Sequence, residues 1–144
     1  MSLQLDNPAE LRQGLDSIFN ASSTSGWVLL NYVGPSTVHF ASAGDEGPDQ
    51  MMQYLADDAI QYGLIRIGRI QQKSGLKVVN RDVFVTFIGP EVSAAEKSDK
   101  SGFLSDAQSL LQPFQASITV LDKYKFSRDN IIDSSDPLGS HVIG

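Results

Sequence analysis

Two histidines, His39 and His141, are the side chains of this 144-residue sequence best suited to proton transfer near neutral pH. His39 alternates within an expected strand and His141 lies near the C-terminal end, so neither has an evident nucleophile or metal ligand beside it. The sequence contains no cysteine, which excludes thiol nucleophiles, Cys-based zinc sites and disulfides. It also lacks a GxGxxG motif and a Walker-type phosphate loop. We therefore expect neither enzymatic activity nor a cofactor.

Residues 44–49 form an acidic loop that offers carboxylate oxygens from Asp45, Glu46 and Asp49. Carboxylates are ligands that calcium prefers, but the DxDxDG order and the distal Glu of an EF-hand are both missing. We therefore expect a solvated loop that leads into the next helix, and no metal site.

The basic residues are unevenly distributed along the chain. The net charge is −6, yet residues 1–63 carry −7, residues 64–128 carry +4 and residues 129–144 carry −3. The negative total disfavours general binding to nucleic acids or anionic membranes. The basic middle instead suits an acidic protein polymer with closely spaced carboxylates.

Arg81 is the leading candidate for a binding contact. It directly precedes a strongly apolar strand, where an edge position would fix its side chain on a rigid element. For Lys77, as for Lys73, a solvated hairpin tip and a binding contact stay equally open. The full set of candidates is Arg81, Lys97, Lys100, Lys123, Lys125, Arg128 and Lys77.

The first half of the chain predicts two helices and a hairpin. Asn7 as N-cap, Pro8 and a face of leucines predict a helix that ends near Phe19. Residues 27–33 and 37–42 read as paired strands. Met52, Leu55, Ala59 and Tyr62 then recur at helical spacing and predict a helix of about 14 residues closed by Gly63.

The second half predicts another hairpin from residues 63–72 and 79–89. Ser93 and Glu96 form a capping box, and Ser101-Gly102 predicts that this helix bends or breaks near residue 101. A fifth strand at 116–122 and a short helix at 126–132 follow. We expect one α/β (α+β) domain over residues 1–133, with a central mixed five-stranded sheet flanked by helices on both faces, and a flexible tail at 134–144.

Several of these strings resemble the ADF/cofilin homology (ADF-H) family, and within it the coactosin branch. Trp27, Val28, Tyr32 and Gly34 in the first strand have the spacing of that branch. The pair Asp57-Asp58 followed by Arg66 is similar to the family's second helix and third strand. The most specific run is NRDVFVTFIGPEVSAAEK, which spans residues 80–97.

The resemblance implies a protein that binds the side of filamentous actin and modulates filament assembly or dynamics. It also implies that Arg81 leads the contact, that Lys97 and Lys100 flank it, and that residues 123–128 are secondary. The helix from Ser101 lacks the family's basic, methionine-containing start, which argues against tight monomer binding and severing. An ADF/cofilin-like depolymerising activity on monomers and filaments is the alternative.

An adaptor that uses the basic residues for a weak phosphoinositide or protein partner is a third reading. With no apolar run long enough to span a bilayer, we expect no membrane insertion and a monomer in the cytoplasm, associated with the cytoskeleton.

Overall fold

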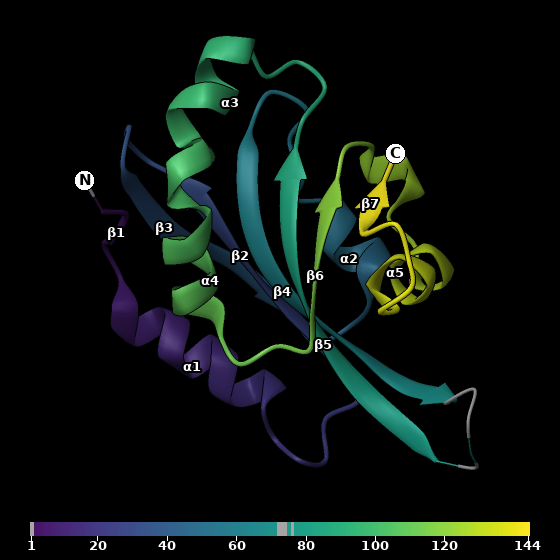
Figure 1. The fold of residues 1–144 in the computed structure, drawn as a ribbon. Helices are drawn as coiled ribbons and strands as arrows, with labels where there is room; N and C mark the ends of the chain where they lie inside the picture. The colour runs from purple at the N-terminus through teal and green to yellow at the C-terminus, as the bar shows by residue number, and fades with distance from the viewer. Residues whose placement is uncertain (1, 72–74, 76) are drawn as a thin grey trace.

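The computed structural model describes residues 2–71, 75 and 77–144, so Lys73 lies outside the described residues. The strands are β1 (Gln4–Leu5), β2 (Ser25–Tyr32), β3 (Thr37–Gly44), β4 (Ile60–Gln71), β5 (Val78–Ile88), β6 (Ala116–Val120) and β7 (Val142–Ile143). The α-helices are α1 (Pro8–Ile18), α2 (Pro48–Met52), α3 (Ala94–Lys100), α4 (Leu104–Leu111) and α5 (Arg128–Ser135). Two 3-10 turns, η1 (Ser101–Phe103) and η2 (Lys123–Lys125), complete the order (Figure 1).

Within the described residues, seven strands form one mixed sheet in the order β1-β3-β2-β4-β5-β6-β7. The long central strands pair antiparallel, whereas β6 runs parallel to β5 and β7 parallel to β6. The α+β class and the mixed sheet are confirmed, and the two extra strands have two residues each.

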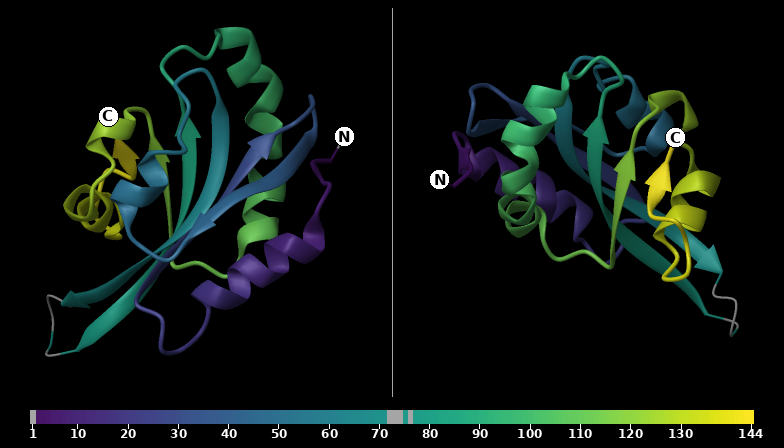
Figure 2. Two further views of the ribbon diagram at one scale, coloured as in Figure 1. Left: turned by 180° about the vertical axis from the view of Figure 1, so that it is seen from behind. Right: turned by 45° about the horizontal axis from the view of Figure 1, so that its top comes forward.

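Helices cover both faces of the sheet, as expected (Figure 2). On one face α1 and the α3–η1–α4 segment pack through Leu11, Phe103 and Leu111 against Val28 and Phe84. On the other face α2 and α5 bury apolar side chains over the same strands, namely Met51 and Ile131 against Trp27, Ile65 and Val85. Such alternation between two covered faces explains why the central strands are apolar throughout.

The helix at Pro8 is confirmed, but Asn7 does not cap it through its side chain. Its amide instead spans to β3, where Nδ2 donates to the Phe40 carbonyl at 3.0 Å and Oδ1 accepts from the Phe40 N–H at 2.8 Å. Asn7 therefore ties the start of α1 to the sheet.

The predicted helix of about 14 residues after Pro48 is wrong, because α2 ends at Met52. Tyr62 and Gly63 belong to β4. A Cβ on Gly63 would lie 2.5 Å from Met51 Cε and 2.9 Å from the Val28 carbonyl oxygen. Glycine is thus required there by close packing inside the sheet, and not by a helix end.

The break near residue 101 is confirmed, since η1 separates α3 from α4. Ser93 caps α3 by accepting the Glu96 N–H at 3.1 Å, as predicted. The other half of the predicted capping box is replaced, because the Glu96 carboxylate accepts from Lys100 Nζ at 2.8 Å.

The chain end differs from the expected flexible tail. Helix α5 continues through Ser134 and Ser135, which are both buried. Beyond it, the Thr119 N–H donates to the His141 carbonyl and the Leu121 N–H to the Ile143 carbonyl, so β7 pairs with β6. Ile143 is 3% exposed and joins the core beneath α5.

The β4–β5 hairpin projects beyond the rest of the sheet (Figures 1 and 2). We call its outer part, residues 67–71 and 77–82, the arm. Strand β6 begins opposite Val83, and the last β4 residue that β2 pairs with is Ile67, so the arm extends past both neighbours. A register shift between Ile67 and Ile70 marks a bulge at its base.

Candidate functional site

Arg81 lies at the base of the arm, opposite Ile67 of β4. Its side chain is half-buried because it reaches across to the C-terminal end of α5. There Nη1 donates to the Ile132 carbonyl at 3.2 Å and to Ser135 Oγ at 2.7 Å. Arg81 therefore lies on a rigid strand, as expected. However, α5 uses part of the hydrogen-bonding capacity of the guanidinium, because the carbonyls at the C-terminal end of a helix favour a cation.

Arg128 holds the other end of α5 against the arm. Ser127 caps this helix by accepting the Asn130 N–H at 3.3 Å, and Arg128 Nη2 donates to the Arg69 carbonyl at 3.3 Å. Two arginines thus connect α5 to both strands of the arm. We call Arg81 and Arg128, with their bonds to Ile132, Ser135 and Arg69, the arginine clamp.

Arg69 is a further basic residue of the arm, outside the set of contacts predicted from the sequence. It is exposed at the arm bulge, with a left-handed backbone of φ 59°, and its N–H donates to Asn80 Oδ1 at 3.4 Å. Gly68 before it is the one signal in the sequence, because glycine inside a strand often marks a bulge. Lys77 is exposed on the same arm. We call Arg69, Lys77, Arg81 and Arg128 the arm surface.

Arg66 is a base of the same hairpin that faces inward. Its Nε and Nη2 donate to the two carboxylate oxygens of Asp82 at 2.7 and 2.9 Å, and Nη1 donates to the carbonyls of Asn20 and Ser23. The hydrogen bonds that Arg66 donates to the Asp82 carboxylate raise the pKa of Arg66. This buried pair therefore braces the base of the arm and leaves no charge for a partner.

Lys97 and Lys100 lie on α3. Lys100 Nζ is 2.8 Å from Glu96 Oε2 and 4.1 Å from the centre of the Tyr32 ring, whereas Lys97 is exposed. Both border a pocket at the Ile60 end of β4.

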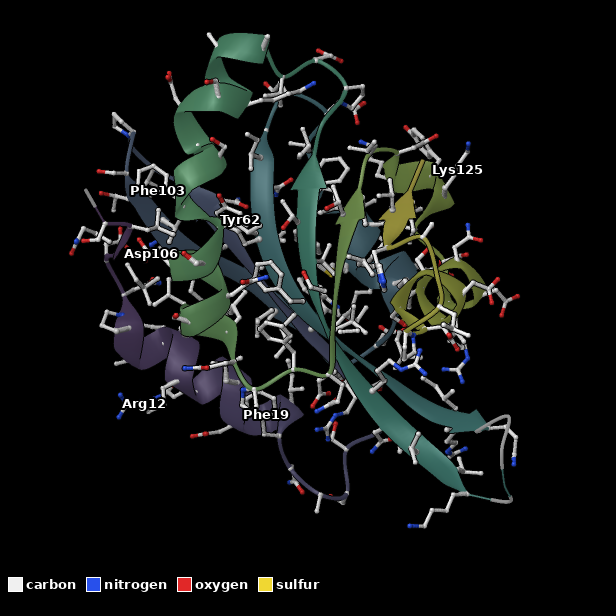
Figure 3. The ribbon with its side chains drawn as sticks, in the orientation of Figure 1. Arg12, Phe19, Tyr62, Phe103, Asp106 and Lys125 are labelled. Carbon is white, nitrogen blue, oxygen red and sulfur yellow. The ribbon has the colours of Figure 1, made fainter. Side chains whose placement is uncertain are left out.

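Lys123 and Lys125 belong to η2, which follows β6. Lys123 is half-buried, donates to the Leu55 carbonyl at 3.3 Å and lies 3.7 Å from Asp57 Oδ1. Lys125 is exposed and lies across the molecule from Arg12 on α1 (Figure 3).

The predicted bases consequently form two groups. β5 and β6 are neighbouring strands, which by itself would allow their bases to lie close together. However, Arg81 faces Ile67, while Lys100 borders Ile60, and seven residues of strand span about 23 Å. Arg81, Arg128 and Lys77 therefore lie at the arm, and the lysines of α3 and η2 lie toward the opposite end of the sheet.

Acidic side chains lie beside the arm surface at Arg128. Arg128 borders a polar groove with Glu46, Asp49 and Asp129. No group of three or more metal-ligating side chains occurs in the described part of the chain. In the same residues no helix combines the length and apolar character needed to cross a bilayer. The arm surface is thus a cluster of basic side chains held on a rigid support.

Comparison with known proteins agrees with this description. A family model described as cofilin/tropomyosin-type actin-binding protein matches residues 5–135. The fold is similar to a crystal structure of human coactosin-like protein, at 20% identity over 90% of this chain and 95% of that one, with a TM-score of 0.74. No curated protein matches in sequence.

Two further coactosin structures have the same fold. Coactosin from Entamoeba histolytica matches at 15% identity over 90% of this chain and 91% of that one, with a TM-score of 0.71. Mouse coactosin, whose structure is described as that of an actin filament binding protein, matches at 19% identity over 91% and 88%, with a TM-score of 0.67. The resemblance drawn from the sequence is confirmed.

Proposed function

The chain belongs to the cofilin/tropomyosin-type actin-binding protein family, and on that premise we propose that it binds the side of actin filaments and modulates their assembly, with little monomer sequestration or severing. We place this non-enzymatic activity in the cytoplasm, at the cytoskeleton.

The arm surface is the observation that supports this proposal most directly. Its cations project from a two-stranded arm and from a helix that the arginine clamp ties to it. Charges held on a rigid support lose less conformational entropy on binding than charges on a loop. A filament side offers repeated acidic sites to such a surface.

The lysines of α3 and η2 are secondary contacts in this proposal. Lys100 and Lys123 are partly neutralised by Glu96 and Asp57. Lys97 and Lys125 are exposed and available. The separation of the two groups means that each would face a different part of the filament.

The expected affinity follows from the binding free energy that each surface charge pair contributes. Each exposed pair contributes about 0.5–1 kcal/mol, so four pairs supply roughly 2–4 kcal/mol. Micromolar binding requires about −8 kcal/mol, so apolar contact must supply the rest. We expect weak binding whose charge-dependent part falls as salt is added.

Co-sedimentation with actin filaments tests the proposal. The protein should pellet at low salt and less at high salt, and Arg128→Glu should reduce pelleting. Arg12→Glu is the matched control, because it makes the same charge change on exposed α1, on the other face of the sheet. Absence of pelleting at low salt, or equal loss in both variants, would refute the proposed surface.

Monomer-binding and severing assays separate this activity from its alternatives. Strong severing or tight monomer binding would favour an ADF/cofilin-like depolymerising factor. Pelleting with phosphoinositide liposomes but not with filaments would favour the adaptor function.

A further inference from the structure

A pocket of about 220 Å³ lies between the α3–η1–α4 segment and strands β4, β5 and β6. The break in the helix borders it, since Ser101 of η1 is one of the lining residues. The pocket is separate from the arm surface, although Lys97 and Lys100, which are secondary contacts in the proposed filament binding, border it.

The walls of this pocket are mainly apolar. Ile60 and Ile88 line it from the sheet and Leu104 from α4. Leu104 is 41% exposed although it borders this cavity, so an apolar ligand would cover surface that now faces water. One side of the pocket is therefore suited to a hydrocarbon group.

The opposite side presents a buried hydrogen-bond donor. Tyr62 lines the pocket and is 2% exposed, and its hydroxyl is 2.7 Å from that of Tyr32 (Figure 3 shows Tyr62 beneath the helical segment). Two hydroxyl groups carry two hydrogens, and one hydrogen bond between them uses only one. Burial raises the pKa of both tyrosines, so both stay protonated. The pair thus retains one O–H. When the Tyr32 hydroxyl donates to that of Tyr62, the O–H of Tyr62, the member that lines the pocket, can donate to a ligand oxygen.

The mouth of the pocket carries positive charge. Lys97 and Lys100 both line it, and Glu96 neutralises only Lys100. Among the described residues, Lys97 makes no salt bridge. An anionic head group would meet one uncompensated ammonium and the tyrosine donor, which form stronger hydrogen bonds with an anion than with a neutral group.

We propose that this pocket binds a small monocarboxylate with an apolar body, such as a short-chain fatty acid. The carboxylate lies among Lys97, Lys100 and the Tyr62 hydroxyl, and the hydrocarbon chain packs against Ile60, Ile88 and Leu104. At about 30 Å³ for each water-sized group, the cavity holds roughly seven or eight non-hydrogen atoms, which is the size of hexanoate.

A titration with sodium hexanoate, monitored by the backbone amide NMR signals of the full chain, tests this site in the absence of actin. We expect saturable shifts confined to the pocket residues. On the same protein, 1-hexanol should bind roughly tenfold more weakly, because it lacks the charge that Lys97 and Lys100 attract. Leu104→Glu should weaken hexanoate binding by at least about tenfold through like-charge repulsion. Ser105→Glu is the matched control, since Ser105 is the exposed neighbour that does not line the pocket, and should leave it unchanged.

Three results would overturn the proposal. These are an absence of saturable shifts, shifts scattered over the basic surface, and equal binding of hexanoate and hexanol. The comparison of hexanoate with hexanol needs no variant, so it decides the question even if Leu104→Glu does not fold. Because the assay contains no actin, its failure leaves the proposed filament binding untouched.

Discussion

Charge reversal at Arg81 should affect both stability and filament binding, and the two effects can be separated. Arg81→Glu removes two hydrogen bonds to α5 and places a carboxylate against the terminal carbonyls of that helix. Losing the bonds of a charged donor costs about 1.5–3 kcal/mol, and the unfavourable helix end adds about 0.3–1 kcal/mol. The total of about 2–4 kcal/mol is smaller than the typical stability of a domain, so the variant should fold.

Urea unfolding measures the first effect. With a slope of about 2 kcal/mol per molar urea, the midpoint of Arg81→Glu should fall by about 1–2 M. Ser135→Ala is the matched variant, because it removes one acceptor of the clamp without changing charge. It should lower the free energy of unfolding by about 1 kcal/mol. An unchanged urea midpoint in Arg81→Glu would refute the clamp.

Filament co-sedimentation measures the second effect. If Arg81 contacts actin directly, Arg81→Glu should stop pelleting, whereas Ser135→Ala should pellet normally despite its lower stability. If both variants lose pelleting, Arg81 acts by positioning α5, and the direct contact is refuted. Normal pelleting of Arg81→Glu would remove Arg81 from the binding surface altogether.

Three further predictions concern the interior. Asp82→Asn leaves the Arg66 guanidinium buried without its carboxylate and should cost about 3–5 kcal/mol in urea unfolding, so a loss under about 1 kcal/mol would contradict the bracing role. Ile143→Ala should cost about 2–5 kcal/mol because this side chain is buried under α5, and an unchanged thermal midpoint would mean that the chain end does not pack as described. A pH titration of tyrosinate absorbance should show Tyr32 and Tyr62 ionising well above the ordinary pKa of about 10, because burial raises both pKa values. Tyr62→Phe should remove one of the two tyrosines that ionise above the ordinary pKa. Ionisation of all four tyrosines near pH 10 would refute the buried pair.

The strands and the broken helix could be predicted because their signals are local. Ser93 and Glu96 are three residues apart, and the apolar run before Gly89 identifies a covered strand without any partner. The prediction of a long helix after Pro48 failed because side-chain contacts of Gln61, one of them to the distant Asn31, override the helical spacing of the apolar residues. Gln61 accepts the Ala56 N–H at 2.9 Å, and its amide group donates to the Tyr54 carbonyl and to Asn31 Oδ1. Periodicity carries no information about such a network.

The candidate site was only partly predictable for a similar reason. The position of Arg81 before an apolar strand was visible in the sequence, and it does occupy a rigid element. Its acceptors, Ile132 and Ser135, are 51 and 54 residues away along the chain, so nothing local indicates them. The separation of Arg81 from Lys97 and Lys100 also depends on strand register, which the sequence alone did not specify.

The two outermost strands, β1 and β7, have a consequence for behaviour at high concentration. Each pairs with its neighbour through only two residues. An edge strand this short gives a second molecule little backbone on which to add a strand of its own. Loss of residues 141–143 would uncover the N–H groups of Thr119 and Leu121 and open the β6 edge to intermolecular pairing. By covering the β6 edge, the chain end therefore helps to prevent self-association of a protein that is proposed to bind along a filament.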